Sequence, residues 1–343
     1  MPMPEAPSTL ETFTLGRFTL PRLWNGLWQL SSNAWGSAPT PKIKKSMEAY
    51  VQHGYTAFAD HYGSSEILFG QFRNARTGQE KIFGATKWCV FRPTEPTREL
   101  VGAAIQERLD RTQSPSVDLL QFHWQNYADR GYMTALQHLV ALRREGKISE
   151  IGLCNFDAST MDEICTKLGP GIIVSNQVQF SLIDTRPMHD MAAMCKKHNV
   201  KLLTYGTLCG GFLADRWLNQ PEPDLYATGT LTPSQRKYLD IILKVWGDWK
   251  LFQALLSTLR AIGDRQGGVS IANVATRWVL DHDFVGAVII GTRLGISDHT
   301  SDNSNVMKLK LTDEDRAAID EVLQRSDGPK LIRSLGDCGA EYR

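Results

Sequence analysis

The sequence has almost no excess charge and no long apolar run. Its 38 Lys and Arg residues face 37 Asp and Glu residues, so the formal charge is +1, and there is no dense basic block. That balance disfavours nucleic acid or an anionic membrane as a partner. No apolar run approaches the roughly 18 residues that a membrane-spanning helix needs, and the N-terminal stretch lacks the basic and apolar segments of a leader. We therefore expect a soluble, cytoplasmic protein.

Cysteine and histidine are few and scattered. The six cysteines form no CxxC pair, and no histidine lies near them at the spacing of a metal site. We expect reduced, mostly buried thiols and no bound metal.

The sequence does contain a regular alternation of short apolar runs with amphipathic segments. Eight runs end at a polar or glycine turn, and they read "LWNGLWQL", "YTAFA", "KIFGATKW", "VDLLQFHW", "EIGLCNF", "IIVSNQVQF", "VKLLTYG" and "VGAVIIG". Between them, segments such as "PKIKKSMEAYVQHG" have the 3.6-residue apolar spacing of helices. Continuously apolar strands that alternate with helices are typical of a parallel sheet covered on both faces. We predict an α/β fold, a (β/α)8 TIM barrel, with an open doubly wound sheet as the alternative.

Three further features are expected around the barrel. Residues 13–24 alternate apolar and polar residues around Gly16, which predicts an N-terminal β-hairpin. The interval 210–284 is too long for a simple crossover, so we expect an elaborated seventh connection of the kind that shapes substrate sites. Because no internal repeat or low-complexity linker is visible, we expect residues 1–343 to form a single domain that ends in a C-terminal tail.

Polar residues at the ends of the predicted strands would gather at one face of the barrel. Asp60 and Tyr62 follow the second run, and Lys87 and His123 lie at the ends of the next two. A neighbouring ammonium group lowers the pKa of a phenol, which is normally about 10, so Tyr62 could protonate a carbonyl oxygen while hydride adds to the carbon. His123 would hold that oxygen by a hydrogen bond, and a carboxylate would hold Lys87. This combination predicts carbonyl reduction.

The motifs around these residues resemble the aldo-keto reductase superfamily, NADPH-dependent oxidoreductases on a (β/α) barrel that lack a GxGxxG motif. The motifs are "DHYGSSE", "ATKWC", "DLLQFHW", "SNQVQFSLID" and "IIGTRLG", and the resemblance extends from "LWNGLWQLS" to "GDCGAEYR". It implies that Tyr62, Lys87 and His123 are members of a catalytic tetrad. The implied reaction is NADPH-dependent reduction of an aldehyde or ketone to an alcohol, with the proton from Tyr62.

The resemblance also implies which residues bind NADPH. Asn155 and Gln177 would bind the nicotinamide carboxamide, and Tyr205 would stack on the nicotinamide ring. The guanidinium fork of Arg293 suits the 2′-phosphate. The whole implied set is Cys154, Asn155, Gln177, Tyr205, Leu208, Gly210, Gly291, Thr292, Arg293, His299, Asp302 and Asn303.

Two departures from the family pattern bear on activity. Cys154 stands where the family usually has serine, so a weak donor replaces a hydroxyl. The aspartate that the family places five residues before the tyrosine falls at Ala57, and two residues are missing here. If Asp60 substitutes for it, the chain is an ordinary reductase; if not, it is an NADP(H)-binding barrel with impaired or non-redox activity. An unrelated barrel hydrolase or isomerase that uses Asp60 and His123 is a third interpretation.

Several tryptophans near the predicted mouth bear on the substrate. Such rings provide a large contact area at low entropy cost, which favours a small carbonyl compound that is apolar or contains a ring. Ordinary barrel packing is the other interpretation, above all for Trp28 and Trp88. The residues in question are Trp28, Trp35, Trp88, Trp124 and Trp217.

Overall fold

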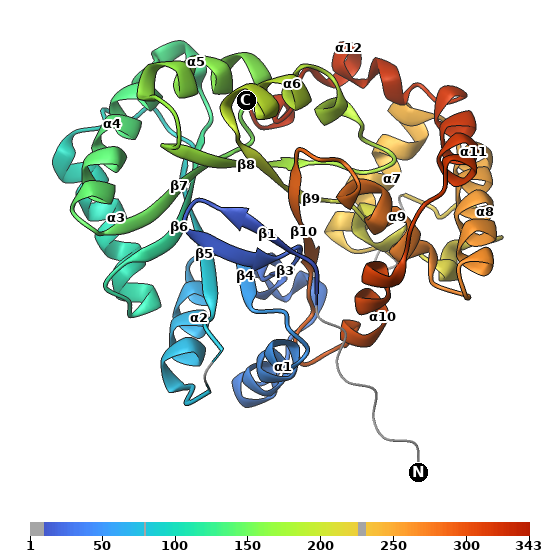
Figure 1. Ribbon diagram of the computed structural model, residues 1–343, viewed down its shortest axis with the longest axis horizontal. Coiled ribbons are helices and arrows are strands. Elements are labelled where there is room, and N and C mark those ends of the chain that lie inside the picture. Colours follow the sequence, from blue (N-terminus) through green and yellow to red (C-terminus); the bar gives the residue numbers. More distant parts are fainter. Residues whose placement is uncertain (1–9, 79, 226–230) are drawn as a thin grey trace.

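A closed ring of eight parallel strands forms the centre of the protein (Figure 1). The computed structural model describes residues 10–78, 80–225 and 231–343, without the side chains of Asp60, His61 and Pro329. The strand order is β10-β3-β4-β5-β6-β7-β8-β9, which confirms the predicted (β/α)8 barrel and excludes the open sheet. The strands are β3 (Leu23–Gly26), β4 (Ala57–His61), β5 (Phe83–Val90), β6 (Val117–Trp124), β7 (Ile148–Cys154), β8 (Ile173–Gln179), β9 (Lys201–Tyr205) and β10 (Val285–Gly291).

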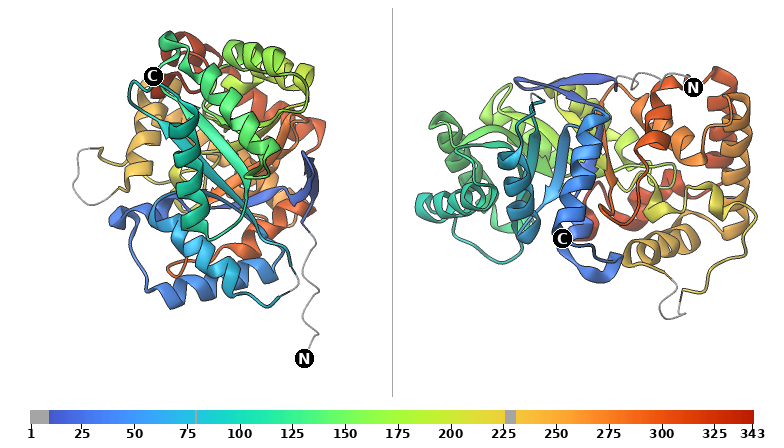
Figure 2. Two further views of the ribbon diagram at one scale, coloured as in Figure 1. Left: turned by 90° about the vertical axis from the view of Figure 1, so that its left-hand side faces the viewer. Right: turned by 90° about the horizontal axis from the view of Figure 1, so that it is seen from below.

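Helices surround this ring and connect consecutive strands (Figures 1 and 2). In α1 the buried residues are Ile43, Met47, Tyr50 and Val51, a spacing that puts them on the single apolar face expected from the sequence. The first six helices are α1 (Thr40–Gln52), α2 (Ser64–Ala75), α3 (Arg98–Thr112), α4 (Gly131–Arg144), α5 (Ala158–Leu168) and α6 (Asp190–His198).

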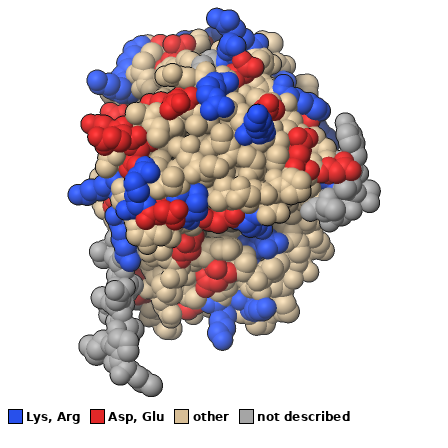
Figure 3. All heavy atoms as spheres, turned by 90° about the vertical axis from the view of Figure 1, so that its right-hand side faces the viewer, with Lys and Arg blue, Asp and Glu red and all other residues tan. Residues whose placement is uncertain are grey.

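The long connection between β9 and β10 carries several helices, as its length predicts. They are α7 (Pro233–Ile241), which continues as one π-helical turn (Ile242–Trp246), α8 (Trp249–Arg265) and α9 (Ile271–Leu280). After β10 the chain forms α10 (Thr300–Ser304), α11 (Asp313–Gln324) and α12 (Leu331–Leu335). No helix in the described ranges is long and apolar enough to cross a membrane. On the side that carries α8 and α11, positive and negative side chains are interspersed (Figure 3).

The predicted N-terminal hairpin closes one end of the barrel. It consists of β1 (Thr12–Leu15) and β2 (Phe18–Pro21), paired antiparallel. Leu15 and Leu20 join an apolar cluster inside the ring together with Trp24. Figure 2 shows this hairpin and the C-terminus at opposite ends of the barrel, so the carboxyl ends of the strands are left for the site.

The C-terminal segment, defined here as residues 336–343, is anchored over the carboxyl ends of the strands. The Asp337 carboxylate accepts a hydrogen bond from the Ala158 backbone N–H at 2.8 Å. The buried guanidinium of Arg186 donates to the Gly336 and Asp337 carbonyl oxygens at 3.3 and 3.2 Å and pairs with Glu341 at 2.9 Å. The predicted tail is therefore a fixed part of the mouth of the barrel.

Candidate active site

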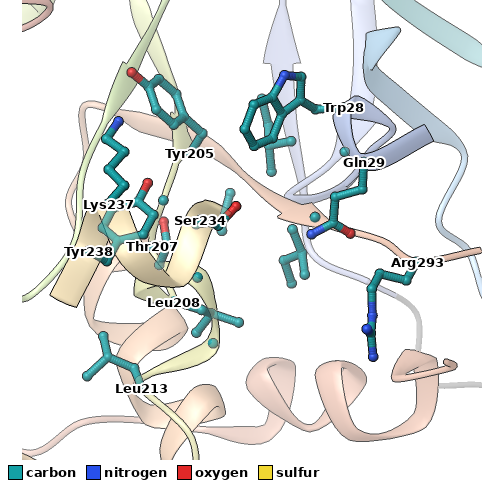
Figure 4. A pocket seen from close by; sticks show the side chains of 18 of the residues that line it. Trp28, Gln29, Tyr205, Thr207, Leu208, Leu213, Ser234, Lys237, Tyr238 and Arg293 are labelled. Carbon is teal, nitrogen blue, oxygen red and sulfur yellow. The ribbon is translucent and has the colours of Figure 1, made fainter. Parts of the chain in front are cut away.

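A cavity of about 1000 Å³ opens at the carboxyl ends of the strands. Its size is at the upper end of the range for small-molecule sites. It gathers residues from elements that are far apart in the sequence, including β5, β6, β9 and α7. Figure 4 shows the part of this cavity between Trp28, Tyr205, Lys237 and Arg293. The implied site residues that line it are Tyr62, Lys87, His123, Cys154, Asn155, Tyr205, Leu208, Gly210, Gly291, Arg293, His299, Asp302 and Asn303.

Tyr62 and Lys87 face each other across two adjacent strand ends. The Lys87 Nζ lies 5.7 Å from the centre of the Tyr62 ring. The fully buried carboxylate of Glu66 accepts hydrogen bonds from the Gly63 N–H, at 3.2 Å, and from the Thr86 hydroxyl. Because Gly63 follows Tyr62 and Thr86 precedes Lys87, one carboxylate fixes the turn after β4 relative to β5. The Lys87 ammonium therefore lies close to the Tyr62 ring.

His123 presents one ring nitrogen to the cavity. Its Nδ1 lies 3.0 Å from the Cys154 carbonyl oxygen, and because a carbonyl only accepts, Nδ1 carries the proton. Its Nε2 is buried and has no hydrogen-bond partner among the described residues. Burial lowers the pKa of His123 below its usual 6.5, and the charges of Lys87 and Arg343 lower it further. At neutral pH the ring is uncharged, and Nε2 is an acceptor.

Of the residues implied for the nicotinamide end, Cys154, Asn155 and Tyr205 line the cavity. Asn155 has the left-handed backbone conformation, with φ 60°, and its Oδ1 accepts a hydrogen bond from the Tyr205 hydroxyl at 2.9 Å. Burial raises the pKa of Tyr205, so this phenol stays protonated. The Cys154 thiol contacts the Gln177 Oε1 at 3.4 Å. Gln177 is fully buried behind Cys154 and is not among the residues that line the cavity.

The residues implied for the adenosine end differ in their exposure. Arg293 is exposed and lines the cavity, whereas Thr292 is buried and both its backbone N–H and its hydroxyl donate to the Gly26 carbonyl at 3.0 Å. The Asp302 carboxylate accepts from Ser270 at 3.0 Å and Asn273 at 3.2 Å. Thr292 therefore joins β10 to β3 and does not itself line the cavity.

The tryptophans are divided between the cavity and the packing. Trp28 lines the cavity, is 43% exposed and packs on Trp35 at 4.6 Å. The Trp35 indole N–H donates to the Ser234 hydroxyl of α7 at 3.2 Å. Trp88 and Trp124 are instead buried around Phe122, and Trp217 packs on Phe212. The predicted aromatic wall is thus limited to Trp28 and its support Trp35.

Several residues that line the cavity are not marked by any motif in the sequence. Gln29 contributes a buried Oε1 with no partner in the described part of the chain. Arg216 and Lys237 come from the long seventh connection, and Phe91 follows β5. Tyr342 comes from the C-terminal segment, and its ring lies edge-on to the His123 ring at 6.3 Å. No motif in the sequence links positions 123 and 342, which meet only in the folded protein.

Comparison with known proteins gives the family. The sequence profile described as "Aldo/keto reductase family" matches residues 22–324. This chain belongs to the aldo/keto reductase family. The aldo-keto reductase YhdN of Bacillus subtilis is 22% identical over 316 residues, which are 89% of this chain and 90% of YhdN.

Two solved structures share the fold of this aldo/keto reductase. The glycerol dehydrogenase AKR11B4 from Gluconobacter oxydans has a TM-score of 0.72 at 23% identity, covering 92% of this chain and 95% of that one. An aldo/keto reductase from Klebsiella pneumoniae in complex with NADP and acetate has a TM-score of 0.68 at 19% identity, covering 92% and 96%. The resemblance inferred from the motifs is confirmed.

The strand before Tyr62 is irregular in this aldo/keto reductase. Ala59 pairs with Ala85, and the next pair joins His61 to Thr86, so Asp60 is an extra residue between them. Such a β-bulge changes the direction in which the following side chains point. Ala57, at the position of the family aspartate, packs in the barrel interior. The Asp60 side chain lies outside the described residues, so its role stays a prediction.

Proposed function

We propose that this chain, acting as a single domain, is an NADPH-dependent reductase of aldehydes or ketones in which Tyr62 donates the proton. Family membership supports carbonyl reduction in general. The observation that carries the specific proposal is the convergence on one cavity of Tyr62, which follows β4, with Lys87 of β5 and His123 of β6. An unrelated hydrolase or isomerase is not supported, because the chain is an aldo/keto reductase.

The residues present fit a nicotinamide dinucleotide. The buried Gln29 Oε1, which has no partner among the described residues, and the side chains of Asn155 and Arg293 offer polar contacts along the cavity. Asn155 and Cys154 would hold the carboxamide, Tyr205 would contact the nicotinamide ring, and Arg216 and Arg293 would bind phosphates. When bound, the cofactor supplies the hydride. The NADP complex of the Klebsiella relative supports this choice.

The proton is assigned to Tyr62 because Lys87 stabilises the tyrosinate that proton donation leaves behind. We propose Asp60 as the carboxylate partner of Lys87. His123 receives a different role from the one expected. With Nδ1 bonded to the Cys154 carbonyl, the neutral ring accepts at Nε2, so it orients a hydroxyl group, either that of Tyr62 or that of the alcohol, instead of donating to the carbonyl oxygen.

Replacing Tyr62 with phenylalanine tests this assignment. We expect turnover of a carbonyl panel, followed by loss of NADPH absorbance, to fall by about 100-fold or more, since general acid catalysis is typically worth 10²–10⁴. NADPH affinity should change only a few-fold, because the phenol acts on the substrate oxygen. Tyr132→Phe is the matched control, because Tyr132 is a buried residue of α4 that donates its hydroxyl to Glu163 and does not line the cavity. Unchanged turnover in Tyr62→Phe would contradict the mechanism.

The second candidate, a cofactor-binding barrel with impaired redox chemistry, is favoured by Ala57 at the family aspartate position and by the bulge at Asp60. If Asp60 holds Lys87, Asp60→Asn should lower kcat by about 100-fold. If the site is impaired, Asp60→Asn should change little. In that case, inserting Asp-Met between Phe58 and Ala59 should raise kcat by at least ~10-fold.

A further inference from the structure

Lys237 of α7 places a cation in the cavity next to three tyrosine rings. Its Nζ lies 5.9 Å from the ring centre of Tyr205, 5.5 Å from that of Tyr238 and 5.1 Å from that of Tyr342. It donates a hydrogen bond to the Tyr342 hydroxyl at 2.9 Å. Within the described part of the chain, no carboxylate oxygen lies within ion-pair distance of this ammonium group. A half-buried cation with only neutral contacts is suited to bind an anion.

The carboxylate that acts on Lys237 through space is already bound elsewhere. Both oxygens of Glu341 contact the Arg186 guanidinium, at 2.9 and 3.0 Å. Burial opposes ionisation of Glu341, but the Arg186 contact outweighs it and lowers the pKa, with a smaller contribution from Lys237. Glu341 is therefore held by Arg186 and leaves the Lys237 ammonium open to the cavity.

Tyr342 connects this cation to the reacting groups. Its ring lies 6.3 Å from the His123 ring, and its hydroxyl lies 3.2 Å from that of Tyr205 (Figure 4 shows Lys237 and Tyr205 on the same wall). Arg343 holds the segment in place by a cation–π contact with Tyr127 at 4.0 Å and an ion pair with Asp157 at 3.3 Å. Tyr342 therefore lies between the Lys237 ammonium group and the ring of His123.

We propose that Lys237 and Tyr342 bind a carboxylate on the substrate, so that the enzyme prefers oxo acids and aldehyde acids to neutral carbonyl compounds. This inference rests on the proposed function. An ammonium group and a phenol can both donate to one carboxylate, and charge-assisted hydrogen bonds of this kind are the strong ones. Trp28 and Phe91, both exposed at the cavity, would contact the apolar part between carbonyl and carboxylate. Arg216 and Arg293 remain for the phosphates of the cofactor.

The experiment compares substrates that differ only in charge. 4-Carboxybenzaldehyde and 4-formylbenzamide carry the same aldehyde, and we expect kcat/KM to be about tenfold or more higher for the acid. Lys237→Met should lower this acid-to-amide ratio by about tenfold, and Lys237→Arg should retain most of it, because the charge is kept. Lys250→Met is the control, since Lys250 is exposed on α8 and does not line the cavity. Raising the salt concentration should reduce the preference.

A binding measurement makes the test independent of turnover. Calorimetry on the protein with NADP+ should show tighter binding of benzoate than of benzamide, and Lys237→Met should remove the difference. Equal binding of the two compounds, or an acid-to-amide ratio that Lys237→Met leaves unchanged, overturns the inference. If Lys237→Met weakens NADPH by tenfold while the ratio stays constant, the ammonium serves the cofactor diphosphate, and the inference is again overturned. If no carbonyl is reduced but the benzoate difference is found, the proposed function fails and the carboxylate site stands.

Discussion

Replacing Gly339 with alanine should strain the contact between the C-terminal segment and the barrel. Gly339 has φ 77°, and an added Cβ would lie 2.1 Å from the Asn155 carbonyl oxygen and 2.7 Å from its carbonyl carbon. The left-handed conformation alone costs an L-residue about 1–2 kcal/mol. The overlap is with backbone, not with the end of a flexible side chain, so relieving it adds about 1–3 kcal/mol. We expect the free energy of unfolding to fall by about 2–5 kcal/mol if the segment stays docked.

Gly146→Ala separates the two contributions. Gly146 has φ 79°, and nothing lies within 4 Å of its added Cβ, so this control carries only the conformational cost of about 1–2 kcal/mol. Urea unfolding of both variants and of the wild type gives the difference, and NADPH titration shows whether Asn155 is disturbed. We expect weaker NADPH binding in Gly339→Ala alone. If Gly339→Ala costs no more than Gly146→Ala, the segment is not packed against Asn155 as described.

Two further predictions concern Arg293 and His282. Arg293→Ala should weaken NADPH binding by about tenfold and leave NADH nearly unchanged, because an exposed guanidinium contributes a charged hydrogen bond only to the 2′-phosphate; equal loss for both cofactors would remove Arg293 from the phosphate site. Burial among aromatic rings lowers the pKa of His282 to about 4. As the pH falls from 6.5 towards 4, the unfolded chain therefore protonates this histidine before the folded protein does, and the free energy of unfolding decreases. In urea unfolding measured at several pH values, His282→Phe should reduce this decrease in the free energy of unfolding by up to about 3 kcal/mol. The same pH dependence in the variant and the wild type would refute this prediction.

The architecture and the main site residues could be predicted because they depend on local pattern. Each apolar run ended at a polar turn, and in a parallel barrel such turns share one face. Tyr62, Lys87 and His123 accordingly line one cavity. Periodicity carries no information on a single extra residue within a strand, so the sequence does not reveal the bulge at Asp60.

The details that could not be predicted depend on contacts between distant parts of the chain. Thr292 matches a motif, yet its hydroxyl donates to the Gly26 carbonyl, which only the closed ring brings near. Lys237 and Tyr342 are 105 positions apart in the sequence and meet through the seventh connection and the C-terminal segment. The donor assignment of His123 follows from the Cys154 carbonyl, a backbone group that no motif specifies.

The junction between β10 and β3 also bears on how the chain folds. Thr292 and Gly26, which join there, are 266 positions apart, and contacts of such separation form late because a long loop must first be closed. Gly26, Gly291 and Arg293 at this junction line the cavity. A ligand bound there would favour the closed ring by mass action, with about 2.7 kcal/mol at one hundred times its dissociation constant. Hydrogen exchange at β3 and β10 should therefore be slower when the ligand is present.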